Sequence, residues 1–242
     1  QSVSGPLVAM NTILADSLDW IAGKLEGELK KGSDQAEAVI KVLKELMQEH
    51  GNVVFVGDGY SAEWHEMSVS ERGLKNIPTT ADALPALREE SVKKLFESTG
   101  VLTPVELESR FEVYAEQYIL SIDVEAKLVV DIAKTRIYPA AIHYLSDLAK
   151  TSESLAAMGI KLDSSTATVV ANELNAMMSA VAELIDAMGK HEVTSIEEHM
   201  HFCANEIRSL MDKVRLHADI LETEVADELW PLPKYQEMLF IR

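Results

Sequence analysis

The chain has 242 residues, 47% of them hydrophobic, and a formal net charge of −18 from 22 basic and 40 acidic side chains. This length and apolar content suffice to bury the core of one large or two modest domains. The negative charge argues against nucleic acid and anionic membranes as partners, because both require a basic surface. Cys203 is the single cysteine, which excludes an internal disulfide and fits a reducing compartment, so we expect a cytoplasmic protein.

The first hundred residues carry the pattern of several helices. Apolar side chains recur every three or four positions over residues 5–30, which predicts an amphipathic helix. A second helix is expected from Asp34 to Gly51, because Asp34 and Glu37 have the spacing of a capping box. Residues 61–100 have a less regular pattern, which predicts short helices.

The stretch NVVFVGDG, residues 52–59, carries the strongest strand signal, because a β-branched run is followed by glycines. One strand cannot form a sheet, so we expect residues 52–56 to pair with backbone outside this sequence. The chain also begins with Gln1 in place of methionine. Both features predict a fragment of a longer protein.

A long helix is predicted to open the second half. Thr103, Pro104 and Glu106 combine a capping residue, a first-turn proline and a capping-box acid. Helical periodicity then continues to about Met158. We expect a kink within a turn of Pro139, because proline removes a backbone donor and crowds the preceding turn.

Two further helices are expected, one over residues 166–188 and one from Ser195, where Glu198 completes another capping box. Three long helices with short connections predict an up-down-up bundle. The fold class is therefore mainly α, with very long helices and an N-terminal helical segment that carries one short orphan strand. The seam of the last helix is expected to contain Ile196, Met200, Cys203, Ile207, Leu210, Val214, His217 and Leu221.

Candidate metal and catalytic residues are few. His199 and Cys203 lie four residues apart, and Glu198 with His201 forms an E-x-x-H step. A di-iron site in a bundle needs two more acids and a second E-x-x-H step, and the sequence contains no second E-x-x-H step. We therefore interpret these residues as first-turn polar groups beside a buried thiol, with no metal bound. His217 is expected to be a core histidine whose polar atoms are satisfied.

The stretch GDGYSAEWHE, residues 57–66, places glycines beside acids and a histidine. It matches neither a dinucleotide-binding motif nor a P-loop. We expect a tight turn in which Ser61 caps the next helix and Trp64 packs inward. Because Cys203 lies in a helix seam, it is not expected to be a nucleophile. Taken by themselves, the residues indicate no catalytic, cofactor-binding or metal site.

The chain ends in an apolar tail, residues 230–242. Pro231 and Pro233 cannot continue a helix and favour extended backbone, which predicts a rigid strap. Such a strap loses little entropy when it docks, and its apolar area can contribute several kcal/mol at roughly 25 cal/mol per Å². The residues expected to dock are Trp230, Leu232, Tyr235, Leu239 and Phe240.

Five stretches, in order, resemble the C-terminal part of type III glutamine synthetases. They are QSVSGPLVAMNTILADSLDWIA, GDGYSAEWHEMSVSERGLKN, TTADALPAL, VEAKLVVDIAKTRIYPAAIHY and DELWPLPKYQEMLF. The resemblance implies an enzyme that ligates ammonia to glutamate with ATP and a divalent metal, Mg or Mn, and that assembles as stacked rings. It also implies that the ATP, glutamate and metal ligands precede Gln1, so no catalytic residue is assigned here.

By this resemblance, residues 1–102 are the C-terminal end of a catalytic domain, and residues 103–242 are a helical bundle extension. The extension would serve scaffolding, oligomer contacts and regulation, with the remainder of the catalytic domain as its partner. Its tail would dock either on the open end of its own bundle or on the catalytic side. The alternative is an autonomous acidic helical interaction module without enzymatic activity.

Overall fold

The computed structural model describes residues 3–190 and 195–239. The chain divides into two compact units, residues 1–113 and 114–242, and the boundary falls inside a long helix. Every regular element in the described residues is a helix, so the expected fold class, mainly α, is confirmed. No helix in this part of the chain combines the length and hydropathy needed to cross a membrane.

The first unit consists of short and medium helices joined by capped turns. Asp34 accepts a hydrogen bond from the backbone N–H of Glu37, and Ser61 accepts one from that of Trp64, so both predicted caps are formed. The helices are α1 (Ser4–Lys30), α2 (Gln35–His50), α3 (Ala62–Ser70), α4 (Thr80–Ala83) and α5 (Glu90–Ser98), with 3-10 turns at Gly51–Val53 and Leu84–Arg88.

The predicted apolar row of α1 is exposed. Leu7, Met10, Leu14 and Leu18 are 59%, 66%, 56% and 56% exposed, although α1 packs against α2 and α5. A row of large apolar side chains in water is unfavourable, and such surfaces usually mark a contact with another chain or domain.

The strand predicted over residues 52–56 is wrong for the described part of the chain. Gly51–Val53 form a 3-10 turn, which Val54 closes by donating its N–H to the Gly51 carbonyl at 3.1 Å. Val54 itself has extended dihedral angles, φ −77° and ψ 117°. β-branched residues favour extended backbone, but a strand also needs a ladder partner, and no strand lies in the described residues to supply one. Pairing with backbone outside this sequence remains a prediction.

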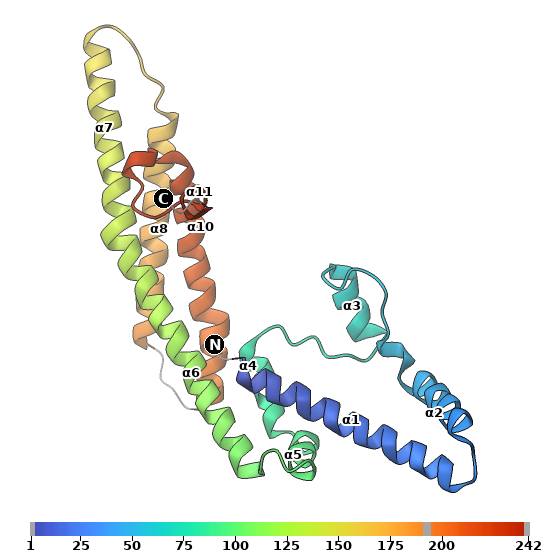
Figure 1. The fold of residues 1–242 in the computed structure, drawn as a ribbon. Helices are drawn as coiled ribbons and strands as arrows, with labels where there is room; N and C mark the ends of the chain where they lie inside the picture. The colour runs from blue at the N-terminus through green and yellow to red at the C-terminus, as the bar shows by residue number, and fades with distance from the viewer. Residues whose placement is uncertain (1–2, 191–194, 240–242) are drawn as a thin grey trace. The chain divides into compact units, whose positions relative to one another are not determined.

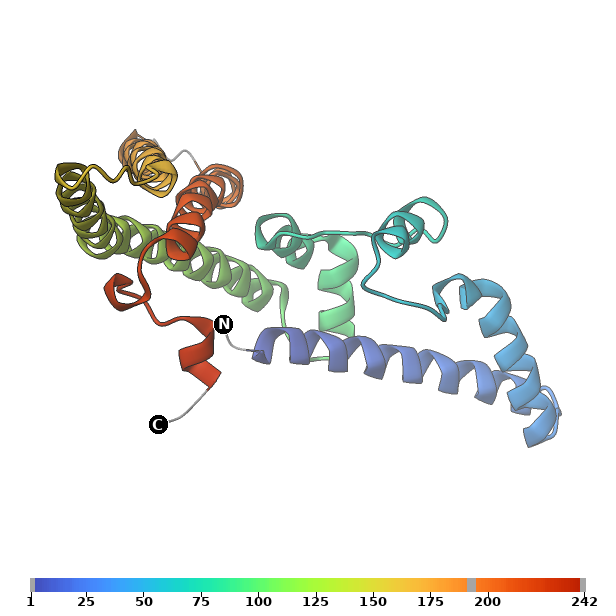
Figure 2. The ribbon, with the colours of Figure 1, turned by 90° about the horizontal axis from the view of Figure 1, so that it is seen from above.

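The second unit is the predicted bundle of three long helical rods. Figure 1 shows the first rod rising, the second descending and the third rising again, and Figure 2 shows the three rods side by side when viewed from above. The first rod is α6 (Pro104–Ile132), a π turn (Ala133–Ile137) and α7 (Tyr138–Ala157); the second is α8 (Ser165–Lys190); the third is α9 (Ile196–Phe202), a π turn (Cys203–Ile207) and α10 (Arg208–Glu224).

The core of this unit lies along the predicted stripes. On α8 the expected positions from Val170 to Leu184 are buried, and on the third rod Met200, Leu210 and Leu221 are buried. The predicted start at Thr103 is also confirmed, because its hydroxyl and backbone N–H both donate to Glu106 Oε2 at 2.8 Å.

The helix continues through Pro139 without a break. The turn that precedes the proline is π-helical, and Tyr138 donates its N–H to the carbonyl of Ala133, five residues back. A π turn accommodates an extra residue inside a helix, and such turns accompany many helix bends. A separation into two independent helices is therefore excluded, while the bend itself remains a prediction.

The tail begins earlier than the sequence predicts. Helix α10 ends at Glu224, a 3-10 turn (Asp227–Leu229) follows, and a short helix α11 (Tyr235–Leu239) comes after the two prolines. The 3-10 turn contacts α7, so the first part of the tail lies against its own bundle.

Candidate functional site

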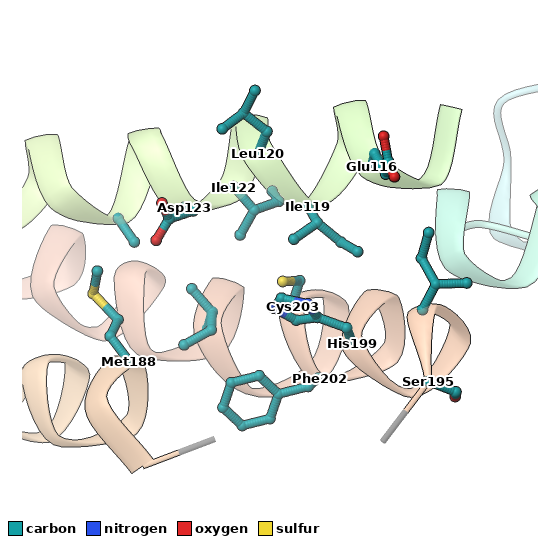
Figure 3. Close-up of a pocket in the computed structure, with 13 residues that line it drawn as sticks. Glu116, Ile119, Leu120, Ile122, Asp123, Met188, Ser195, His199, Phe202 and Cys203 are labelled. Carbon is teal, nitrogen blue, oxygen red and sulfur yellow. The ribbon is translucent and has the colours of Figure 1, made fainter. Parts of the chain in front are cut away.

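A cleft of about 700 Å³ lies within the second unit, between α6 and the start of the third rod (Figure 3). Most of its wall is apolar, and the polar groups are few. Helix α6 contributes Glu116, Ile119, Leu120, Ile122, Asp123 and Ala126; α8 contributes Met188; the third rod contributes Ser195, Ile196, His199, Phe202, Cys203 and Ile207.

Helical spacing places these side chains on facing surfaces. Ser195 caps the third rod by accepting a hydrogen bond from Glu198 N–H at 3.2 Å, as predicted. His199 and Cys203, four residues apart, then project from one face of the rod. Figure 3 shows both pointing toward α6, where Ile119 and Ile122 point back at them.

The electrostatics of the cleft keep the thiol protonated. Burial raises the pKa of the Cys203 thiol above its ordinary value, and the negative charge of Asp123 raises it further. Asp123 itself accepts a hydrogen bond from Lys127 at 2.6 Å. A nucleophilic cysteine requires a lowered pKa, so this cleft can hold an apolar group but lacks an activated sulfur.

The described residues do not form a divalent metal site. His199 and Cys203 line the cleft, but no group of three His, Cys, Asp or Glu side chains converges anywhere in residues 3–190 and 195–239. Glu198 is exposed at the N-terminus of α9. Because these residues do not fit a divalent metal, no chemical step through one is assigned to this chain.

The His217 side chain has a hydrogen-bond partner, as predicted, but the sequence did not indicate which residue this partner is. The Nδ1 atom of His217 lies 2.7 Å from Glu173 Oε2, and this pair joins α10 to α8. Both side chains are about three-quarters buried, with exposed fractions of 25% and 24%. The two residues are 44 positions apart, so only the packing of the two helices reveals the pair.

The predicted tight turn before α3 is formed, because Tyr60 and Ser61 donate their N–H groups to the Asp58 side chain and carbonyl. An arginine organises the residues that precede this turn. Arg72 Nη1 donates to the carbonyls of Asn52 and Val54 at 2.9 and 2.8 Å. The Phe55 ring stacks on Trp64 with 3.9 Å between centroids, and the guanidinium lies 5.4 Å from each ring. Sequence reasoning placed Trp64 inward but missed Arg72, for which no local motif exists.

The predicted docking residues of the tail have different environments. Trp230 is buried, and its Nε1 has no hydrogen-bond partner among the described residues. Leu232 is half-buried, whereas Leu239 is 59% exposed. Tyr235 opens α11, but its side chain and all of Phe240 lie outside the described residues. The tail therefore has a buried first part and an exposed apolar end.

Comparison with known proteins shows a family to which part of this chain is similar. Residues 38–156 match the family described as the glutamine synthetase C-terminal domain. This match covers parts of both structural units.

Three relatives extend the similarity along the chain. The chain is 36% identical over 252 residues to the type-3 glutamine synthetase of Dictyostelium discoideum, covering 100% of this chain and 34% of the relative. It is 29% identical over 245 residues to a glutamine synthetase of Bacteroides fragilis (strain YCH46), covering 98% and 34%. A glutamine synthetase of Butyrivibrio fibrisolvens is 28% identical over 217 residues, covering 86% and 30%.

Nearly half of the chain thus matches the glutamine synthetase C-terminal domain. The chain is similar to the C-terminal part of type-3 glutamine synthetases, as the sequence resemblance implied, and it spans about a third of the length of the relatives that it matches.

Proposed function

We propose that this chain is the C-terminal portion of a cytoplasmic glutamine synthetase, an enzyme that joins ammonia to glutamate at the expense of ATP. The observation that carries the proposal is the 36% identity to a type-3 enzyme over the whole chain. Since the chain spans about a third of that relative, the ATP, glutamate and Mg or Mn ligands would come from residues outside it.

Within this proposal, residues 1–102 complete the catalytic domain and residues 103–242 form the helical extension. The exposed apolar row on α1, which includes Leu7, Met10 and Leu14, supports the first assignment. Such a row is typical of a helix that packs against another domain. The extension would then serve as a scaffold, contribute to homo-oligomeric stacked rings and receive regulatory signals.

The tail would tie the extension to the catalytic body or to a neighbouring subunit. Its first part, at Trp230, is already buried. The exposed Met238 and Leu239 on α11 are the residues available for a second contact, with exposed fractions of 65% and 59%. Apolar side chains at that exposure favour burial against another surface.

The test compares two purified proteins, residues 1–242 and the full-length protein that contains them, in a glutamine-forming assay with ATP and Mg²⁺ or Mn²⁺. We expect ligase activity from the full-length protein and none from residues 1–242. Activity of residues 1–242 alone would contradict the assignment of all catalytic ligands to other residues. A coding sequence without a catalytic region would favour the alternative, an autonomous acidic interaction module.

A further inference from the structure

The cleft between α6 and the start of the third rod has the size and composition of a small-molecule pocket. Its volume of about 700 Å³ lies in the range of ligand sites, and its wall is mostly apolar with a few polar groups, as is usual for such sites. Its two facing sides are helices of the second unit. Helices hold side chains more precisely than loops do, so the wall is preorganised for a ligand.

The third rod changes its helical geometry at this cleft. Cys203–Ile207 form a π turn, in which Arg208 donates its N–H to the carbonyl of Cys203, five residues back. Cys203 and Ile207, the first and last residues of the turn, both line the cleft. π turns inside α-helices are uncommon and are frequently found at functional sites. The backbone geometry and the cleft therefore mark the same part of the bundle.

The most buried polar group of the cleft wall is the Cys203 thiol. Cys203 is 4% exposed, and its sulfur makes no hydrogen bond with the residues that the structure describes. Figure 3 shows this side chain pointing into the space between the third rod and α6. A thiol is a weak donor and a weak acceptor, so it tolerates an apolar neighbour. A molecule bound in the cleft would cover this sulfur.

The charge of the cleft wall is negative. Glu116 and Asp123 contribute carboxylates, and no Lys or Arg is among the described residues that line the cleft. Asp123 Oδ2 accepts a hydrogen bond from Lys127 at 2.6 Å, whereas no described residue donates to Oδ1. Figure 3 shows the Asp123 side chain directed toward the third rod. One carboxylate oxygen is therefore available to a cationic donor, and an anionic ligand would be repelled.

We propose that this cleft binds a small apolar molecule that carries one protonated amine, an alkylamine or arylalkylamine. The amine donates to Asp123 Oδ1, and the apolar body lies against Ile119 and Ile122 with the Cys203 thiol beside it. The apolar body matches most of the wall, and the single cation matches the carboxylate and the formal net charge of −18. This inference goes beyond the proposed function and does not depend on it, because every lining residue belongs to the second unit.

The Cys203 thiol itself reports whether the cleft is occupied. The test measures the rate at which iodoacetamide modifies Cys203 in the full-length protein that contains this chain, by mass spectrometry of the peptide that carries this residue. The probe is phenylbutylamine, which is protonated at about pH 8, and the matched molecules are the neutral phenylbutanol and the anionic phenylbutyrate. We expect phenylbutylamine to slow the modification in a saturable way, by at least about fivefold, because the bound molecule covers the sulfur.

The matched molecules separate the contribution of the charge from that of the apolar body. Phenylbutanol should require an about tenfold higher concentration for the same protection, because it lacks the charge-assisted hydrogen bond. Phenylbutyrate should give no protection. Equal protection by the three molecules, or no protection by phenylbutylamine, overturns the proposal.

Asp123→Asn tests the counter-ion, since asparagine keeps the shape of the side chain and removes its charge. The concentration of phenylbutylamine needed for half-maximal protection should rise by about tenfold. Because this substitution also changes the reactivity of the nearby thiol, protection is expressed as the ratio of the rates without and with the probe. Asp131→Asn, at an exposed acid of α6 that does not line the cleft, is the control. Protection that survives Asp123→Asn unchanged rejects the proposed counter-ion.

Ile119→Trp tests the contact with the apolar body. A larger ring at this lining position occupies part of the cleft, so protection by phenylbutylamine and by phenylbutanol should both weaken. Leu128→Trp, at an exposed position of α6 outside the cleft, is the matched control. Unchanged protection in Ile119→Trp would place the binding elsewhere and overturn the proposal. None of these measurements uses ligase activity, so their outcome is distinguishable from a failure of the proposed function.

Discussion

His217 Nδ1 lies 2.7 Å from Glu173 Oε2, and this contact joins α10 to α8 through two side chains that are about three-quarters buried. A second contact between the same helices, Lys213 to Glu183 at 3.2 Å, is more than half exposed on both sides. The two pairs form a matched comparison of a partly buried and a solvated polar contact.

Removal of Glu173 should therefore destabilise the chain more than removal of Glu183. Glu173→Ala leaves a largely buried imidazole without its partner, and we expect a loss of about 1 kcal/mol in the free energy of unfolding. Glu183→Ala breaks a surface ion pair, which is worth at most about 0.5 kcal/mol. Urea denaturation of both variants measures the difference, and equal losses would contradict a special role for the His217 contact.

Cys203 should make the stability of the chain fall at alkaline pH. Its pKa is raised above the ordinary value of 9.0 by burial, so the folded state holds the proton more tightly than the unfolded state. The contribution is complete below the unfolded pKa and is lost as the pH rises from there through the folded pKa. Cys203→Ala should flatten this decline on the alkaline side of the ordinary thiol pKa, although Tyr118, whose pKa burial also raises, keeps part of it.

The burial of Cys203 also predicts that its thiol reacts slowly with alkylating reagents. Iodoacetamide should modify Cys203 much more slowly in the folded chain than in urea, because the reactive thiolate is disfavoured and shielded. Rapid modification of the folded chain at neutral pH would show that the cleft activates the sulfur, contrary to the burial and to the adjacent Asp123 carboxylate.

The two parts of the tail should respond differently to substitution. Trp230→Ala removes a buried ring and should destabilise residues 1–242 by about 3 kcal/mol. Trp230→Phe keeps an aromatic ring and removes a donor that has no partner in the described residues, so its effect should be smaller. Thermal unfolding followed by circular dichroism distinguishes the two variants.

Leu239→Asp should leave the stability of residues 1–242 unchanged, since Leu239 is 59% exposed. In the full-length protein it should loosen the extension or the ring, which light scattering and thermal unfolding can detect. Deletion of residues 230–242 should have the same effect on assembly while the bundle remains helical. Unchanged assembly, stability and activity in both variants would remove the basis for a docking tail.

Pro139→Ala should straighten or stiffen the first rod. Alanine restores the backbone donor that proline lacks and relieves the crowding that accompanies the preceding π turn. We expect little change in the unfolding of residues 1–242 and a larger disturbance of assembly in the full-length protein. Glu153→Ala, at an exposed position on the same helix, is the control. The bend itself can be measured in a crystal structure, where a straight helix at Pro139 would disprove it.

Several elements could be predicted from the sequence because their determinants are local. The caps at Asp34, Ser61, Thr103 and Ser195 each need only a side chain and a backbone N–H two or three residues away, and all four are formed. The stripes of α8 and the third rod follow from the helical period, which is set by residues within a few turns.

The family resemblance was also a property of the sequence alone, since it depends on the order of residues and not on their contacts. It is borne out along the whole chain. The docking residues of the tail follow only from their apolar character, which predicts that they favour burial but does not predict the surface against which they are buried.

Tertiary structure decided the features that depend on residues far apart in the chain. The β-branched run at residues 52–56 favours extended backbone, but a strand needs a neighbouring strand, and the described residues contain none. The carbonyls of Asn52 and Val54 instead accept hydrogen bonds from the Arg72 side chain. The His217–Glu173 pair requires α8 and α10 to lie side by side. The cleft likewise exists because α6 faces the start of the third rod, since local propensity determines which helices form while long-range packing determines which side chains meet.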